Sequence, residues 1–84
     1  MAWFVYIAQA RTGRYYTGIT TDPRRRISDH NKGKGAKFAK DQGDLTLVYK
    51  SSPHESKSEA RTREIQIKGW TRAKKEKLIG GEWN

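Results

Sequence analysis

Two β-prone segments separated by a short turn constrain this chain most, because they predict a hairpin near its start. Residues 3–8 and 15–20 are rich in aromatic and β-branched side chains, and residues 11–13, Arg-Thr-Gly, are typical of a turn. Side chains alternate along a strand, so Tyr6 and Tyr16 each belong to a definite face of the hairpin. If the turn centres near its arginine, the two tyrosines lie nearly opposite each other across the strands and are close enough to share a site.

A helix is expected after the hairpin. Asp22 followed by Pro23 combines an N-cap residue with proline at the first helical position, and Gly33 ends the segment as a left-handed C-cap would. The interval allows roughly two to three helical turns. Arg26 and His30 are four residues apart within it, so both side chains project from one side of the helix.

The remaining segments complete a mixed fold. Residues 33–37 form a basic, glycine-rich loop, and residues 45–49 predict a third strand. Good helix formers dominate residues 55–70, and residues 71–79 predict a short final helix that two glycines end. The predicted fold is α/β (α+β): strand, strand, helix, strand, helix, helix, with a small, mainly antiparallel three-stranded sheet flanked by helices.

The length of the chain allows one core. Eighty-four residues with 33% hydrophobic content bury too little apolar surface for two. Residues 1–84 are therefore interpreted as a single domain, with its core at about 3–79 and a short C-terminal tail. The sequence has no cysteine, so disulfides and thiolate-bound zinc are excluded.

The charge of the chain favours a polyanionic partner. Eighteen Lys and Arg against nine Asp and Glu give a formal net charge of +9, which is typical of proteins that bind nucleic acid. An anionic membrane is the weaker alternative, because no apolar run approaches the roughly 20 residues that span a bilayer. The apolar N-terminus has no basic leader, so we expect a cytoplasmic protein.

One carboxylate falls on the apolar side of the predicted helix over 55–70. Glu64 lies on or beside the stripe that Ala60 and Ile67 form at helical spacing. A carboxylate at such a position costs free energy to desolvate unless a cation or hydrogen-bond donors compensate for the lost water. An ion pair with Lys68, four residues further on, is the purely structural explanation.

An ordered set of motifs carries a resemblance to a known family. Val5-Tyr6-Ile7 is followed, ten residues after Tyr6, by Tyr16-Thr17-Gly18. The later members of the set are, in order, Arg26, His30 and Glu64. With strands and helices in matching places, the chain resembles the GIY-YIG endonuclease family, closest to its small single-domain bacterial members, over nearly its whole length. The resemblance implies metal-dependent hydrolysis of DNA phosphodiester bonds with one divalent cation, Mg²⁺ or Mn²⁺.

The residue chemistry agrees with that implication. Glu64 supplies a hard oxygen ligand suited to Mg²⁺ or Mn²⁺, with water and the substrate phosphate completing the coordination shell. Arg26 offers a planar fork of donors that matches phosphate oxygens and can neutralise the charge that develops on them. One carboxylate is consistent with one metal ion.

The two tyrosines and the histidine are the candidates for proton transfer. A phenol acts as a base at neutral pH only beside positive charge. We favour Tyr16 as the general base, with Tyr6 orienting the water or sharing the proton and His30 relaying it. By the resemblance, Gly18 serves packing, because a side chain there would crowd the space between the tyrosines and the metal.

Further basic residues are expected to contact the DNA backbone. They are Arg24, Arg25, Lys34, Lys37 and Lys68.

The chain departs from the family pattern twice. Some members carry a lysine three residues after the second tyrosine, where this chain has Ile19, and many have an asparagine after the glutamate helix, where the next asparagine here is Asn84.

Several alternatives stay open at this stage. Each tyrosine taken singly is an ordinary strand aromatic, and His30 could instead cap its helix. The whole chain could be a nucleic-acid-binding module that has lost catalysis, with DNA or RNA as its ligand, or a scaffold for acidic proteins. So small a domain has little surface for reading bases, so branched or single-stranded DNA is favoured over a sequence motif. A protein partner could supply specificity, and a monomer is favoured.

Overall fold

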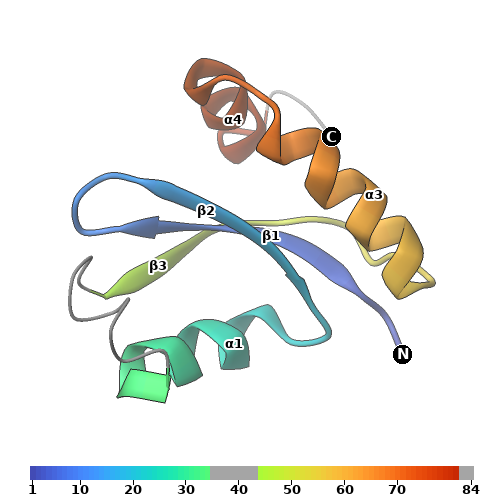
Figure 1. The fold of residues 1–84 in the computed structure, drawn as a ribbon, viewed down its shortest axis with the longest axis horizontal. Helices are drawn as coiled ribbons and strands as arrows, with labels where there is room; N and C mark the ends of the chain where they lie inside the picture. Colours follow the sequence, from blue (N-terminus) through green and yellow to red (C-terminus); the bar gives the residue numbers. More distant parts are fainter. Residues whose placement is uncertain (35–43, 82–84) are drawn as a thin grey trace.

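The fold is built on an antiparallel sheet of three strands in the order β2-β1-β3 (Figure 1). The computed structural model describes residues 1–34 and 44–81. The strands are β1 (Phe4–Ala10), β2 (Tyr15–Thr20) and β3 (Leu45–Lys50). They confirm the three predicted strands. Strand β1 is central, and both faces of the sheet are covered, so its small and branched side chains are buried while the edge strand β2 is only half-buried.

The hairpin between β1 and β2 closes one residue later than the sequence suggested. The N–H of Ala10 donates to the carbonyl of Arg14 at 2.9 Å, and Gly13 adopts a φ of +94° in the turn, a left-handed conformation that glycine accommodates readily. The turn therefore centres on Thr12, and Gly18, not Tyr16, stands opposite Tyr6. The prediction that the tyrosines face each other directly is wrong by two residues. Because that shift is even, their shared face is unchanged.

Helices cover the two faces of the sheet in separate layers (Figure 1). On one face lies α1 (Pro23–Asp29), which continues as a π-helical turn, η1 (His30–Lys34). On the other lie α3 (Lys57–Lys68) and α4 (Arg72–Ile79). The order strand, strand, helix, strand, helix, helix is as predicted. Gly33 lies inside η1, so the predicted helix end at this glycine is wrong.

Each helix begins at a side chain that caps it. Asp22, Ser56 and Thr71 accept hydrogen bonds from backbone N–H groups three residues further on, at 3.1 to 3.2 Å. These bonds satisfy N–H groups that have no partner within the helix. At the other end of α4, Gly81 has a φ of +83°, so the chain leaves this helix at the predicted glycines.

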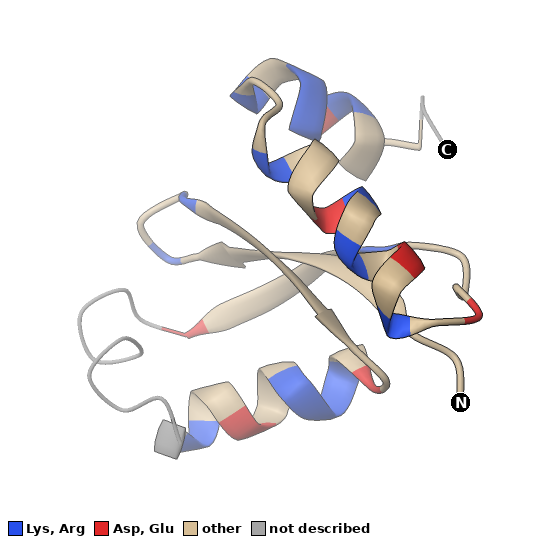
Figure 2. Ribbon diagram, turned by 45° about the vertical axis from the view of Figure 1, so that its right-hand side comes forward, with Lys and Arg blue, Asp and Glu red and all other residues tan. Residues whose placement is uncertain are grey.

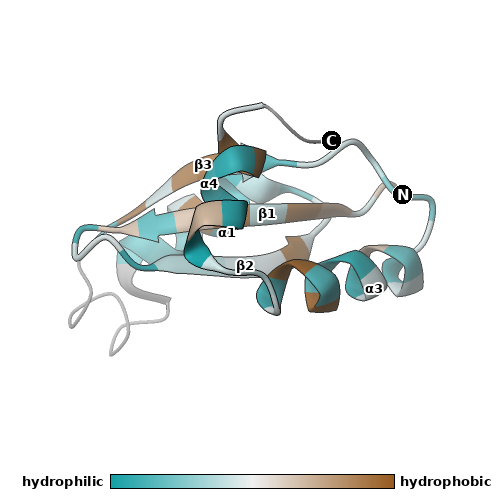
Figure 3. Ribbon diagram, turned by 90° about the horizontal axis from the view of Figure 1, so that it is seen from above, coloured by the Kyte–Doolittle hydropathy of each residue, from teal (hydrophilic) through white to brown (hydrophobic). Residues whose placement is uncertain are grey.

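The core consists of two clusters, one on each face of β1. Val5 and Ile7 pack with residues of α3 and α4, and Ala8 and Ala10 pack with Ile27 of α1 and with β3. Figure 3 shows apolar colour at positions along the strands and at single positions of the helices, which are otherwise largely hydrophilic. None of the helices among the described residues is long and apolar enough to cross a membrane.

A polar contact ties α4 to the edge strand. Tyr15 donates its hydroxyl hydrogen to Glu76 at 3.2 Å, and the guanidinium of Arg72 lies 4.4 Å from the centre of its ring. Burial raises the pKa of Tyr15 above its usual value, and the hydrogen bond to Glu76 raises it further against the lowering effect of Arg72. Tyr15 thus belongs to the α3 and α4 side of the sheet, whereas its neighbour Tyr16 faces α1.

Candidate functional site

A pocket of about 150 Å³ lies between the sheet and α1. The side chains that line it come from both strands of the hairpin, from α1 with its π-helical turn, and from β3. They are Tyr6, Tyr16, Arg26, Ile27, His30 and Leu45. Four residues that the sequence singled out for chemistry therefore meet in one small space, although up to 24 positions of sequence separate them.

The two tyrosines lie diagonally across the hairpin. Tyr6 pairs with Gly18 and Tyr16 pairs with Ala8, so the tyrosine positions are offset by two residues on the same face. Diagonal neighbours in an antiparallel pair are still within reach of aromatic side chains. Both rings are half-buried and pack beside Ala8, Ala10 and the apolar residues of α1 and β3, so each ring is held in place beside the pocket that it lines.

Glycine at position 18 leaves the space beside it to the ring of Tyr6. A Cβ atom at position 18 would lie 2.7 Å from the hydroxyl oxygen of Tyr6 and 2.8 Å from its Cζ, closer than non-bonded atoms approach. The ring of Tyr6 occupies the space that any side chain at position 18 would need. This geometry supports the packing role expected for Gly18, with the crowding directed at the Tyr6 phenol.

One turn of α1 brings Arg26 and His30 to the same pocket. Asp22 and Pro23 start the helix, and the four-residue spacing then aligns the two side chains. Arg26 is largely exposed, so its guanidinium can reach a ligand from solvent. His30 is half-buried with its Nε2 atom fully inside the protein. Its backbone N–H bonds the last carbonyls of α1, so the capping role belongs to the backbone while the imidazole lines the pocket.

Asn31 is a residue of this site that the sequence did not single out. Its side-chain amide donates to the carbonyl of Leu45 at 2.9 Å and accepts from the N–H of Leu45 at 2.8 Å. These two bonds pin the residue after His30 to the start of β3 and so close one wall of the pocket. The only signal in the sequence was an asparagine directly after a histidine at a predicted helix end, which does not identify a partner fourteen residues away.

Glu64 is buried on α3 and is not among the residues that line this pocket. It is 4% exposed and lies on the buried stripe between Ala60 and Ile67. Its two carboxylate oxygens are paired with Arg61 at 3.2 Å and with Lys68 at 3.5 Å. The predicted structural explanation, an ion pair with Lys68, is therefore confirmed. Arg61 is a second partner that the sequence did not suggest.

The two partners of Glu64 are themselves open to solvent. The side chains of Arg61 and Lys68 are 62% and 56% exposed, so the carboxylate faces a wet, cationic edge of α3. Removing either partner would leave this buried carboxylate with less compensation for its charge. Lys68, predicted to contact DNA, neutralises Glu64 in this structure.

The donor chemistry fits a single hard cation held by one carboxylate. Within residues 1–34 and 44–81, no group of three or more His, Asp or Glu side chains converges as a metal site. Mg²⁺ commonly uses one or two carboxylates and completes its shell with water and substrate phosphate. Glu64 is the residue that could hold such an ion, in place of the two cations that now neutralise it.

The predicted DNA contacts are distributed unevenly. Arg24 and Arg25 are exposed on α1, and Arg25 lies 3.9 Å from Asp29. The side chain of Lys34 and all of Lys37 lie outside the described residues. Figure 2 shows Lys and Arg on α1 and also along α3 and α4, on the opposite side of the sheet. Ile19, at the position where some family members carry lysine, packs against the core cluster of Val5 and Ile7 and so faces away from the pocket.

The arrangement of a tyrosine-bearing hairpin, a helix with Arg26 and His30, and a later helix with a buried glutamate is that of a small GIY-YIG-type catalytic domain. Residues 2–77 match the sequence profile of the GIY-YIG catalytic domain, so the chain belongs to the GIY-YIG family, a family of nucleases.

Curated relatives come from bacteria and an archaeon. A UPF0213 protein of Cronobacter sakazakii is 49% identical over 80 residues, which cover 95% of this chain and 83% of the relative. The UPF0213 protein YhbQ of Escherichia coli K12 is 43% identical over 77 residues, with coverage of 92% and 76%. A UPF0213 protein of Halobacterium salinarum is 47% identical over 75 residues, with coverage of 89% and 96%.

Two solved structures share the fold. The solution NMR structure of the UPF0213 protein BH0048 from Bacillus halodurans superposes with a TM-score of 0.59 at 42% identity, over 95% of this chain and 84% of the other. The solution NMR structure of the protein EF2693 from E. faecalis gives a TM-score of 0.63 at 32% identity, over 96% and 85%. The α+β architecture is therefore shared with these relatives.

Proposed function

We propose that this protein is a metal-dependent endonuclease that hydrolyses DNA phosphodiester bonds, with branched or single-stranded DNA as its preferred substrate. The observation that carries the proposal is the convergence of Tyr6, Tyr16, Arg26 and His30 in one pocket in a chain of the GIY-YIG family. The net charge of +9 supports a polyanionic substrate. A monomer acting in the cytoplasm, with or without a protein partner that adds specificity, completes the proposal.

Arg26 binds and neutralises the scissile phosphate. Its guanidinium is exposed at the pocket, where a planar fork can take two phosphate oxygens. The hydrogen bonds it makes strengthen as negative charge builds up on the phosphorane-like transition state, so Arg26 lowers the barrier more than it tightens ground-state binding.

The phenols and the imidazole handle the proton of the attacking water. Tyr16 takes the proton, and the diagonal neighbour Tyr6 orients the water against the phosphate. The guanidinium of Arg26 lines the same pocket, where it can hold the phosphate beside the attacking water. His30, whose side chain lines the same pocket, accepts the proton from the phenol.

Glu64 is the proposed ligand for one Mg²⁺ or Mn²⁺ ion. When bound, such an ion would supply Lewis acidity, and it would do so from α3, which covers the face of the sheet opposite to that of Arg26. The contribution of this chain is a nearly buried carboxylate whose present partners, Arg61 and Lys68, have exposed side chains. Displacing them would free both carboxylate oxygens.

One observation favours a second candidate, a nucleic-acid-binding module of the same fold without catalysis. Glu64 has both oxygens paired within its own helix and is not among the residues lining the pocket of Tyr6 and Tyr16. A protein that only binds DNA backbone would keep this arrangement, since the ion pairs stabilise α3.

A cleavage assay with paired variants tests the proposal. Wild type is incubated with single-stranded, duplex and branched DNA in Mg²⁺ or Mn²⁺, beside Tyr16→Phe and Glu64→Gln. Tyr15→Phe is the matched control. It removes the same hydroxyl from the residue directly before Tyr16 in β2, whose side chain lies on the opposite face of the sheet. We expect a loss of about 100-fold or more for the first two variants, in the range of a lost acid–base group, and near wild-type rates for the control.

The same assay separates the two candidates. If wild type binds DNA but cleaves no form of it with either metal, the enzyme proposal is wrong and the binding module stands. If cleavage occurs and Glu64→Gln cleaves as fast as wild type, Glu64 is not the metal ligand. Retained DNA binding by Glu64→Gln shows that the variant still folds.

A further inference from the structure

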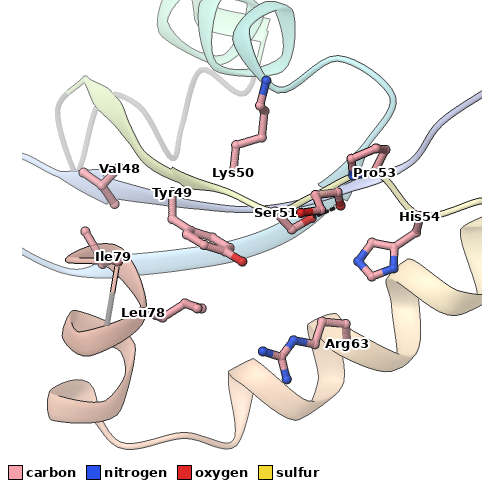
Figure 4. Close-up of a pocket in the computed structure, with 11 residues that line it drawn as sticks. Val48, Tyr49, Lys50, Ser51, Pro53, His54, Arg63, Leu78 and Ile79 are labelled. Atoms are coloured by element: carbon pink, nitrogen blue, oxygen red, sulfur yellow. Dashed lines mark hydrogen bonds between the residues drawn. The ribbon is translucent and has the colours of Figure 1, made fainter. Parts of the chain in front are cut away.

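A second and larger pocket, of about 500 Å³, opens on the other face of the sheet between β3, α3 and α4 (Figure 4). Pockets of this size hold small-molecule ligands in other proteins. Tyr6, Tyr16 and Arg26 lie on the far side of the sheet, and Glu64 of α3 is not among the described residues that line this pocket. The proposed active site therefore gives no reason for this cavity.

One wall of this pocket carries side chains that can donate hydrogen bonds and that bear no negative charge at neutral pH. The side chains of Arg63, His54 and Tyr49 point into a common space in Figure 4. Lys50 borders the pocket, but its ammonium lies 5.3 Å from the ring centre of Phe4 and points away from the cavity. No Asp or Glu is among the described residues that line it. The wall is suited to an anion.

Contacts with its own helix and with the following turn help to hold Arg63 in place. It donates to Oε1 of Gln66 at 2.8 Å, and its guanidinium lies 4.9 Å from the ring centre of Trp70. A guanidinium ordered in this way loses less conformational entropy when it binds a ligand. Its planar fork matches the geometry of a phosphate.

The opposite wall is apolar. Val48 of β3 with Leu78 and Ile79 of α4 line it, and Leu78 is only 1% exposed. The ring of Tyr49 borders both walls. Burial raises the pKa of Tyr49, against the lowering effect of the Arg63 charge, so at neutral pH its hydroxyl is a neutral donor and its ring a neutral stacking surface.

We propose that this pocket binds a nucleotide, with the base against the ring of Tyr49 and the apolar side chains of α4 and the phosphate toward Arg63 and His54. A bare phosphate would leave the apolar wall in contact with water, and an uncharged base would make no use of the positive charge of Arg63 on the polar wall. A ligand with a planar apolar body and an anionic group satisfies both walls. The site is separate from the proposed active site and does not depend on catalysis there.

Two sources supply this chemistry, a free mononucleotide and an unpaired nucleotide of a strand. Helices α3 and α4, which frame the pocket, carry eight Lys or Arg against three Glu. Such an excess attracts phosphates of either source.

An NMR titration of the full chain tests the proposal. Amide shifts are followed on addition of deoxyadenosine 5′-monophosphate, of deoxyadenosine, of inorganic phosphate and of a short oligodeoxyadenylate, all at one ionic strength. We expect saturable shifts that centre on β3, the loop after it and the end of α4, and weaker binding of the nucleoside and of phosphate than of the nucleotide. Saturation by the oligonucleotide but not by the mononucleotide identifies a strand as the source.

Charge-matched variants make the test specific. Arg63→Gln should weaken nucleotide binding about tenfold or more, the loss expected for one charged hydrogen bond. Arg14→Gln removes the same charge from the exposed hairpin turn and should leave the affinity unchanged. His54→Gln and Tyr49→Phe, whose amide spectra report correct folding, should each weaken binding severalfold. The proposal is overturned if no ligand gives saturable shifts at this pocket, or if Arg14→Gln and Arg63→Gln weaken binding equally.

Discussion

The close approach of Gly18 to Tyr6 gives the sharpest expectation for the site. In Gly18→Ala the new methyl group would start 2.7 Å from the Tyr6 hydroxyl oxygen, and ordinary contact begins at 3.4 Å, so the phenol must retreat by about 0.7 Å. The crowded atoms are at the tip of a side chain, not in the backbone. The ring can therefore give way, and we expect the free energy of unfolding to fall by about 1 kcal/mol, at the low end for overpacking.

The same displacement should cost far more in activity than in stability. A reacting group misplaced by about 1 Å can lose 100-fold in rate, so a retreat of Tyr6 by most of that distance should lower kcat/KM on the order of 10- to 100-fold. The assay is cleavage of the preferred DNA substrate under conditions where urea denaturation shows the variant to be fully folded. Substrate binding should change little, because Arg26 is not disturbed.

Gly69→Ala is the matched control. It adds the same methyl group at the end of α3, where the nearest atom lies at an ordinary 3.5 Å, and should keep both activity and stability near wild type. A double-mutant cycle adds a second check, since in a Tyr6→Ala background Gly18→Ala should cost less stability than it does alone. Equal activity of Gly18→Ala and Gly69→Ala would refute the reasoning.

Three further outcomes are expected. Asn31→Ala removes both side-chain bonds to the backbone of β3 and should lower the free energy of unfolding by about 1–3 kcal/mol, measured by urea denaturation; a change below about 0.5 kcal/mol would contradict the clamp. Stability should fall as the pH rises above about 10, because burial raises the pKa values of Tyr15 and Tyr49. Each stays protonated in the fold where the unfolded chain has begun to ionise, so its contribution is complete below its ordinary pKa and is lost as the pH passes the folded pKa. Tyr15→Phe and Tyr49→Phe should each reduce this alkaline loss in pH-dependent melting, and an unchanged profile in both would count against it. Lys68→Gln should change the free energy of unfolding by less than about 1 kcal/mol, because the lysine in its ion pair with Glu64 is exposed to solvent. A larger loss in urea denaturation would mean that Lys68 alone balances the charge of the buried Glu64 carboxylate.

The two faces of the sheet carry different chemistry because strand residues alternate. Tyr16 faces α1 and the small pocket, while Tyr15 faces α4, where it bonds Glu76. One strand thus supplies a candidate catalytic phenol to one layer and a structural phenol to the other. Substituting Tyr15 and Tyr16 one at a time therefore separates effects on the two faces of the sheet.

Much of the fold followed from local patterns. Side-chain alternation gave the faces of Tyr6 and Tyr16, and the cap at Asp22 gave the start of α1 and the common side of Arg26 and His30. These features depend on residues within a few positions of each other, so the sequence carries them directly. The predicted centre of the turn, Arg11, was one residue too early. Several residues of this segment are compatible with a turn, and the left-handed conformation of Gly13 places its centre at Thr12.

The sequence by itself determined which residues share a strand face or a helix side, and through the ordered motifs it determined the family. Only the tertiary structure decided that four of those residues meet in one pocket, that Asn31 reaches Leu45, and that Glu64 is neutralised by Arg61 as well as Lys68. It also decided that a separate cavity forms between β3 and the last two helices. The physical reason is that the period of a helix or strand fixes the directions of the side chains within that element. The distances between side chains of different elements depend on how the helices pack against the sheet.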